Sequence, residues 1–61
     1  MKIYVEIGGR APTIIDKARS KADAERKIKH YEYWDRYSIE TEKYKMPEAW
    51  GGRYPVYSYG K

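Results

Sequence analysis

The chain has to complete any core with tyrosine and tryptophan. Its 61 residues contain eight Tyr, two Trp and no Phe, and its aliphatic residues alone are too few for a core. Every ring therefore carries a polar group, which favours half-buried positions or a wet interface. A chain this small and poor in aliphatic residues is expected to bury part of its rings, to self-associate as a homodimer, or to fold onto a partner. Nine of the ten rings lie in residues 31–61: Tyr31, Tyr33, Trp34, Tyr37, Tyr44, Trp50, Tyr54, Tyr57 and Tyr59.

The N-terminal residues predict a β-hairpin. Apolar and polar residues alternate over residues 2–7, which is typical of a half-buried strand with Ile3, Val5 and Ile7 on one face. Residues 8–12 predict a turn, because they contain two glycines and a proline. Residues 13–19 predict the returning strand, and either Ile14 or Ile15 could face inward.

A helix is predicted to follow the hairpin. Ser20 is a favourable N-cap, and Asp23 favours the positive end of the helix dipole. The residues that follow are good helix formers and predict a helix from 21 to about 31 or 34. Its narrow apolar stripe, which is expected to cover the first strand, consists of Ala24, Ile28 and Tyr31.

The remaining residues predict a third strand and an aromatic tail. Residues 37–45 alternate in polarity, which favours a strand that ends before Pro47. Residues 47–61 are rich in glycine, proline and aromatic rings, and Val56–Tyr59 could add a short edge strand. The expected fold class is therefore α+β, a small antiparallel sheet with one helix packed on one face. Residues 1–46 would form a compact ββαβ domain, and residues 47–61 a tail packed on it or ordered on binding.

Positive charge is concentrated in one segment. The net charge is +4, and residues 10–30 supply all of it, because they hold seven bases and three acids. Such a segment could neutralise several phosphates, so DNA or RNA binding is the alternative function. Acidic residues are interleaved, which favours an ordinary solvated helix face. The seven bases are Arg10, Lys17, Arg19, Lys21, Arg26, Lys27 and Lys29.

The sequence offers little for catalysis, metals or membranes. It has no cysteine, which excludes disulfides and thiolate metal sites. His30 is expected to sit at the helix C-terminal end, and the acidic pairs Glu40/Glu42 and Glu32/Asp35 to be solvated. We therefore expect no enzymatic activity, no cofactor and no bound metal. The chain begins at Met and has neither a signal peptide nor a membrane span, so a complete cytoplasmic protein without membrane association is expected.

Two resemblances bear on function. The run Ser-Lys-Ala-Asp-Ala-Glu-Arg-Lys at residues 20–27, after a strand, a glycine turn and a strand, is similar to arm-type DNA-binding domains of phage and transposon integrases. Those domains read DNA with a small sheet. Residues 2–45 also resemble short ββαβ proteins of phages and mobile elements. Small, basic, Tyr-rich domains of this kind are common among phage proteins that block host machinery.

The aromatic half of the chain is expected to carry the function. Tyr, Trp and Arg are enriched at protein–protein hot spots. The leading hypothesis is a non-catalytic protein-interaction module, plausibly a phage or mobile-element inhibitor or adaptor of a host nucleic-acid-handling complex. Residues 50–54 also resemble a stacking platform for single-stranded bases. About half of the rings, namely Tyr31, Trp34, Tyr37 and Trp50, are expected to complete the core. The expected partner-binding residues are Trp50, Arg53, Tyr54, Tyr57 and Tyr59.

Overall fold

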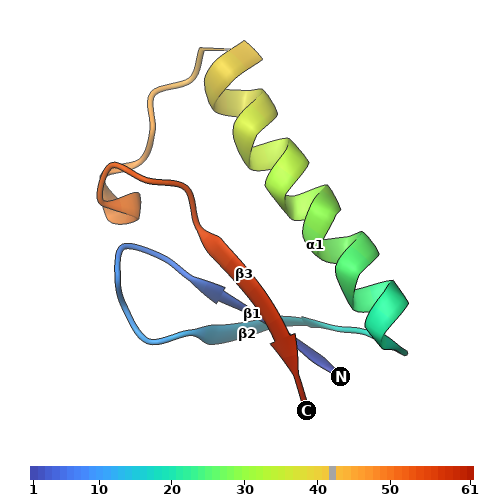
Figure 1. Ribbon diagram of the computed structural model, residues 1–61. Helices are drawn as coiled ribbons and strands as arrows, with labels where there is room; N and C mark the ends of the chain where they lie inside the picture. The colour runs from blue at the N-terminus through green and yellow to red at the C-terminus, as the bar shows by residue number, and fades with distance from the viewer. Residues whose placement is uncertain (42) are drawn as a thin grey trace.

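The alternating N-terminal segment forms strand β1 (Lys2–Glu6), which lies in the middle of a three-stranded antiparallel sheet of order β2–β1–β3. The computed structural model describes residues 1–41 and 43–61. One long helix, α1, lies along one face of the sheet, and both chain ends lie at the same end of the molecule (Figure 1). The expected α+β class, with a small antiparallel sheet and one helix, is confirmed.

The predicted hairpin joins β1 to β2 (Thr13–Lys17). Gly8 and Gly9 take φ values of +62° and +76° in the turn, which glycine adopts without strain. A shift of register between Ile3 and Tyr4 places Asp16 opposite Ile3. Neither isoleucine of β2 is buried as a result, and Ile14 is 54% and Ile15 41% exposed.

Helix α1 (Lys21–Arg36) begins where the sequence predicts. The Ser20 hydroxyl accepts a hydrogen bond from the Asp23 amide at 3.2 Å, and the Asp23 carboxylate accepts one from the Arg19 amide at 3.0 Å. These two bonds satisfy amide groups at the helix N-terminus that have no partner within the helix. The helix runs past the predicted end and continues directly into a π-helical turn, η1 (Tyr37–Thr41).

The predicted strand over residues 37–45 is therefore wrong. Tyr37 stacks on Tyr33 one helical turn earlier, with ring centroids 5.8 Å apart, and this contact requires helical spacing. The described residues between 41 and the 3₁₀ turn η2 (Glu48–Trp50) form no strand. Glu42, one member of the acidic pair considered above, lies outside the described residues.

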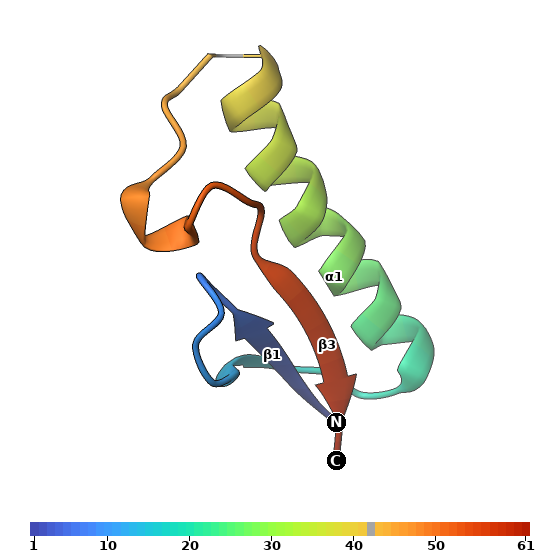
Figure 2. The ribbon, with the colours of Figure 1, turned by 60° about the vertical axis from the view of Figure 1, so that its left-hand side comes forward.

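The third strand comes instead from the C-terminal segment. Strand β3 (Val56–Gly60) pairs with the whole length of β1 and lies beside α1 in both views (Figures 1 and 2). The expected short C-terminal strand is thus confirmed. The 3₁₀ turn η2 lies close to the hairpin turn (Figure 2), where a Cβ atom on Gly8 would overlap the Ala49 carbonyl oxygen.

The core is small and lies between β1 and α1. Ile3 and Ala24 are completely buried, and Ala18 nearly so. Ile28 from the helix and Tyr59 from β3 pack against this cluster. The helix therefore covers the Ile3 face of the sheet, as its apolar stripe predicts, and an aromatic ring helps to close the core.

Candidate protein-interaction surface

Three aromatic rings gather on the C-terminal half of α1. Tyr33 stacks on Tyr37. Trp34 packs edge-on against both rings, with ring centroids 5.5 Å apart in each pair. Tyr33 is 57% exposed and Trp34 is 49% exposed. The Trp34 indole Nε1–H also donates to His30 Nε2 at 3.0 Å. These rings therefore form an ordered cluster that still presents a large area to solvent.

The cluster lies on the side of α1 that faces away from the sheet. Tyr31 and Asp35 bond to side chains of β2 and β3, so they mark the inward side. Tyr33 and Tyr37 each follow one of these residues by two positions, which is a rotation of about 200° around a helix. The exposed rings consequently do not contribute to the core.

Arg36 connects this cluster to the segment before β3. Its guanidinium lies 5.5 Å from the centre of the Tyr54 ring, and the Tyr54 hydroxyl donates to Glu40 at 3.1 Å. Loss of hydration, followed by the bond to Glu40, raises the pKa of the Tyr54 phenol. The ring centroids of Trp50 and Tyr54 are 6.2 Å apart. We call the resulting set of residues the aromatic surface: Tyr33, Trp34, Arg36, Tyr37, Trp50 and Tyr54.

The aromatic surface also contains a shallow hollow. Tyr33, Arg36 and Tyr37 line it together with Glu40 and Thr41, and its volume is about 220 Å³. The two tyrosine rings and the guanidinium thus surround a depression that an incoming side chain could enter. This combination of residue types is the one enriched at the centres of protein–protein interfaces.

Tyr57 and Tyr59 lie elsewhere, between β3 and the helix. Tyr57 stacks on Tyr31 at 5.3 Å and donates to Asp35 at 2.7 Å. Burial, followed by this bond, raises the pKa of the Tyr57 phenol well above its ordinary range. Tyr59 packs on the core and donates to Glu25 at 3.3 Å. Both rings therefore hold the sheet and the helix together.

Of the five expected partner-binding residues, the structure brings Trp50 and Tyr54 together and places Tyr54 beside Arg36 of α1. Arg53 points to the hairpin turn, where its guanidinium nitrogen comes within 3.3 Å of the Cβ position of Gly9. Tyr33 was not among the expected residues, and Trp34 was expected in the core. The available signal was the four-residue spacing of His30–Trp34 and Tyr33–Tyr37, which gives an outward aromatic face once the helix extends to residue 37.

The seven bases of residues 10–30 do not form one patch. Arg10 lies in the hairpin turn, whereas Lys17 is at the far end of β2. Arg26 pairs with Asp23 at 2.6 Å. Lys27 lies 3.8 Å from the carboxylates of both Asp16 and Asp23. The bases without a salt bridge among the described residues are Arg10, Lys17, Arg19, Lys21 and Lys29.

The carboxylates beside these bases have clear structural roles. Asp16 accepts bonds from the Lys17 amide and the Tyr31 hydroxyl, and Asp23 accepts bonds from the Arg19 amide and the Arg26 guanidinium. These bonds, led in each case by the backbone amide, lower the pKa of both carboxyl groups. The acids interleaved with the basic segment thus anchor β2 and the start of α1.

The remaining candidate groups are a histidine and two acids of α1. His30 contacts Trp34, Asp35 contacts Tyr57, and Glu32 lies on the edge of a groove beside β3. Across residues 1–41 and 43–61, no three metal-ligating side chains form a group, and no helix is long and apolar enough to cross a membrane. No protein-family model, curated protein or solved structure matches this chain.

Proposed function

We propose that this chain is a non-catalytic protein-interaction module that docks through the aromatic surface into an apolar groove with an acidic rim on a protein partner. The observation that carries the proposal is the contact among Tyr33, Trp34 and Tyr37 on the outward side of α1. Ordered rings lose little conformational freedom on binding, and they bury a large area when they enter a groove.

The spacing of the exposed residues supports a helical docking mode. His30, Tyr33, Trp34 and Tyr37 occupy positions i, i+3, i+4 and i+7, which is the pattern of anchors by which a helix enters a groove. Their span is about 10 Å along the helix axis. A groove that receives two turns of helix would cover the three rings at once.

The charges around the rings support an acidic rim on the partner. Arg26 precedes the rings on the outward side of the helix, and its side chain is 72% exposed. Arg36 follows within the aromatic surface itself. A partner with carboxylates around an apolar groove would gain both association rate and orientation from these bases.

A narrower role is proposed on the resemblance alone. Residues 2–45 resemble short ββαβ proteins of phages and mobile elements, which supports an inhibitor or adaptor of a host nucleic-acid-handling complex. Direct DNA or RNA binding is a second candidate function, because basic side chains lie at the start of α1. Arg19 and Lys21 lie beside the helix N-terminus and make no salt bridge among the described residues.

The proposal is tested by capture of partners from a host cell lysate with the tagged chain. Tyr33→Ala combined with Trp34→Ala should abolish capture while leaving the circular dichroism spectrum unchanged. Ile14→Ala is the control, because Ile14 is 54% exposed and lies on β2, outside the aromatic surface. The control should capture the same partner as the unmodified chain, and nuclease treatment should not alter the result.

Two outcomes would reject the docking proposal. One is capture that survives loss of both rings. The other is capture that disappears with nuclease, falls steeply with salt and is lost on Arg19→Glu with Lys21→Glu. That second pattern is the counterion-release behaviour of a nucleic-acid-binding protein.

A further inference from the structure

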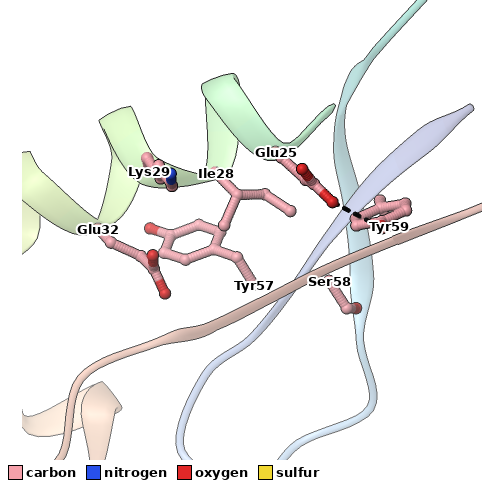
Figure 3. Close-up of a pocket in the computed structure, with 7 residues that line it drawn as sticks. All are labelled: Glu25, Ile28, Lys29, Glu32, Tyr57, Ser58 and Tyr59. Atoms are coloured by element: carbon pink, nitrogen blue, oxygen red, sulfur yellow. Dashed lines mark hydrogen bonds between the residues drawn. The ribbon is translucent and has the colours of Figure 1, made fainter. Parts of the chain in front are cut away.

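A groove of about 470 Å³ runs between α1 and β3, on the side of the helix opposite His30 and Trp34. Its walls are the aliphatic side chain of Ile28 and the rings of Tyr57 and Tyr59. Figure 3 shows Ile28 and Tyr57 directed toward each other from the two elements, with Glu25 and Glu32 at either end of the groove and Lys29 on the helix between them.

The strand beside this groove has one unpaired edge. The sheet order is β2–β1–β3, so β3 pairs with β1 only. In an antiparallel pair every second residue directs its N–H and C=O away from the partner strand. Among the described residues, no backbone hydrogen bond reaches this outer edge of β3. An edge of this kind is a template for an additional strand.

The charges of the groove determine which strand it favours. The charged groups that line the groove are two carboxylates, from Glu25 and Glu32, and one ammonium group, from Lys29. The balance is negative, although the chain as a whole carries +4. A second copy that paired its own β3 antiparallel here would bring Glu25 toward the Glu32 of its neighbour, which is repulsive. A basic segment from a different protein is complementary to the groove.

We propose that the β3 edge and this groove bind an extended segment of a protein partner that carries lysine or arginine. The segment would add as a fourth strand through backbone hydrogen bonds to β3. Alternate side chains of the segment would enter the groove over Ile28 and Tyr57, and basic side chains at the two ends would meet Glu32 and Glu25. The site is separate from the aromatic surface and does not depend on its function.

The spacing of the two carboxylates defines a probe peptide. Glu25 and Glu32 are about 10 Å apart along the helix axis, and same-face residues i and i+4 of an extended peptide are about 13 Å apart. Flexible lysine side chains can span the difference. The probe is a capped nine-residue peptide of valine and threonine with lysine at its third and seventh positions, which places one valine between the lysines on the same face.

Binding is measured on the full ¹⁵N-labelled chain by nuclear magnetic resonance. The peptide should shift the amide signals of Val56–Gly60 and of Ile28 and leave those of Tyr33 and Trp34 unchanged. A peptide with glutamate in place of both lysines should bind at least about tenfold more weakly. A peptide with N-methyl groups on all its backbone nitrogens has no N–H to donate to β3 from either edge and should not bind.

Two charge-reversed variants of the protein complete the test. Glu32→Lys should lower the affinity for the peptide about fivefold, because it inverts the charge at one end of the groove. Glu48→Lys is the matched control, because Glu48 is an exposed acid of the 3₁₀ turn outside the groove, and its effect should be below about twofold. The proposal is overturned if the N-methylated peptide binds as well as the probe, or if the shifted amides lie away from β3. It is also overturned if sedimentation shows a dimer and the amide signals place β3 at its interface.

Discussion

Tyr31 and Tyr33 are two residues apart on the same helix, yet they belong to different environments. The Tyr31 hydroxyl donates to Asp16 at 2.9 Å, and its ring stacks on Tyr57 of β3. Tyr33 contacts only Trp34 and Tyr37 among the aromatic residues, and its hydroxyl has no hydrogen bond within the described residues. The comparison teaches that the inward tyrosines replace missing aliphatic residues, because the hydroxyl of each half-buried ring donates to a carboxylate.

The inward pattern is repeated at three places between the sheet and the helix. Tyr31 bonds to Asp16, Tyr57 to Asp35 and Tyr59 to Glu25. Each pair joins a side chain of α1 to one of the sheet. A phenol can be packed in this way at little cost only if its hydroxyl keeps a partner. The hydroxyl groups of Tyr33 and Tyr37, by contrast, make no hydrogen bond among the described residues, and this difference supports the proposed interface on their side of α1.

Removal of β3 should have the largest effect on this arrangement. A chain that ends after Arg53 loses Tyr57 and Tyr59 and leaves β1 with β2 as its only neighbour, and an isolated two-stranded hairpin is marginal in water. We expect no cooperative thermal transition in the circular dichroism signal. A chain that lacks only Lys61 is the control and should melt like the full protein. If the shorter chain keeps a cooperative transition, Tyr57 and Tyr59 are not needed for folding and remain free for a partner.

Alkaline pH should have the next largest effect, because it removes the phenolic protons of the inward tyrosines and so lowers the free energy of unfolding. The bond to Asp16 raises the pKa of Tyr31, and burial raises that of Tyr57. The folded chain therefore keeps these phenolic protons above the ordinary pKa of about 10, where the unfolded chain has lost them. Their contribution to the free energy of unfolding is complete below about pH 10 and is lost as the pH rises further.

Urea denaturation at several pH values, with absorbance near 295 nm to follow phenolate, measures this loss. Tyr57→Phe removes one of the three phenols whose pKa is raised, the others being Tyr31 and Tyr54, and should reduce the dependence of stability on pH above about 10. Tyr33→Phe is the control and should leave that dependence unchanged. Equal behaviour of the two variants would contradict the difference between the inward and outward sides.

Removal of single hydroxyl groups should separate the two sides directly. Tyr31→Phe removes the hydrogen bond that the Asp16 carboxylate accepts, and it should lower the free energy of unfolding by about 1 kcal/mol. Tyr33→Phe removes a hydroxyl that is exposed to water and should change it by less than about 0.5 kcal/mol. Urea denaturation at neutral pH gives both values. Equal losses would mean that the Tyr33 hydroxyl supports the fold as much as the Tyr31 hydroxyl does.

Much of the fold could be predicted from local signals. The alternation of Ile3 and Val5, the two glycines of the turn and the Ser20 cap each act within a few residues, so the hairpin and the helix start follow from the sequence. The short C-terminal strand also follows from its alternation. The helix end does not, because residues 37–41 satisfy a strand pattern as well as a helical one, and the stacking of Tyr37 on Tyr33 decides between them.

The candidate site was harder to predict than the fold for the same reason. Whether Trp34 faces the core or the solvent depends on a helix that continues beyond residue 34, and the sequence left that end open. The exposure of Ile14 and Ile15 depends on the register shift beside Ile3. No residue type in the sequence indicates that shift. Both features are set by packing between segments that are distant in the chain.

The smallest expected effect on stability concerns His30. Its Nε2 accepts the Trp34 indole hydrogen at 3.0 Å, and this bond lies at an exposed position of the helix. His30→Ala should change the free energy of unfolding by less than about 0.5 kcal/mol, because water replaces the bond at an exposed site. The same variant should weaken partner binding, since Trp34 is no longer held against Tyr33 and Tyr37. Urea denaturation and partner affinity, measured on the same preparation, test both parts. A loss of more than about 1 kcal/mol in stability would show that the outward rings support the fold as the inward tyrosines do. The distinction between the two sides of α1 would then fail.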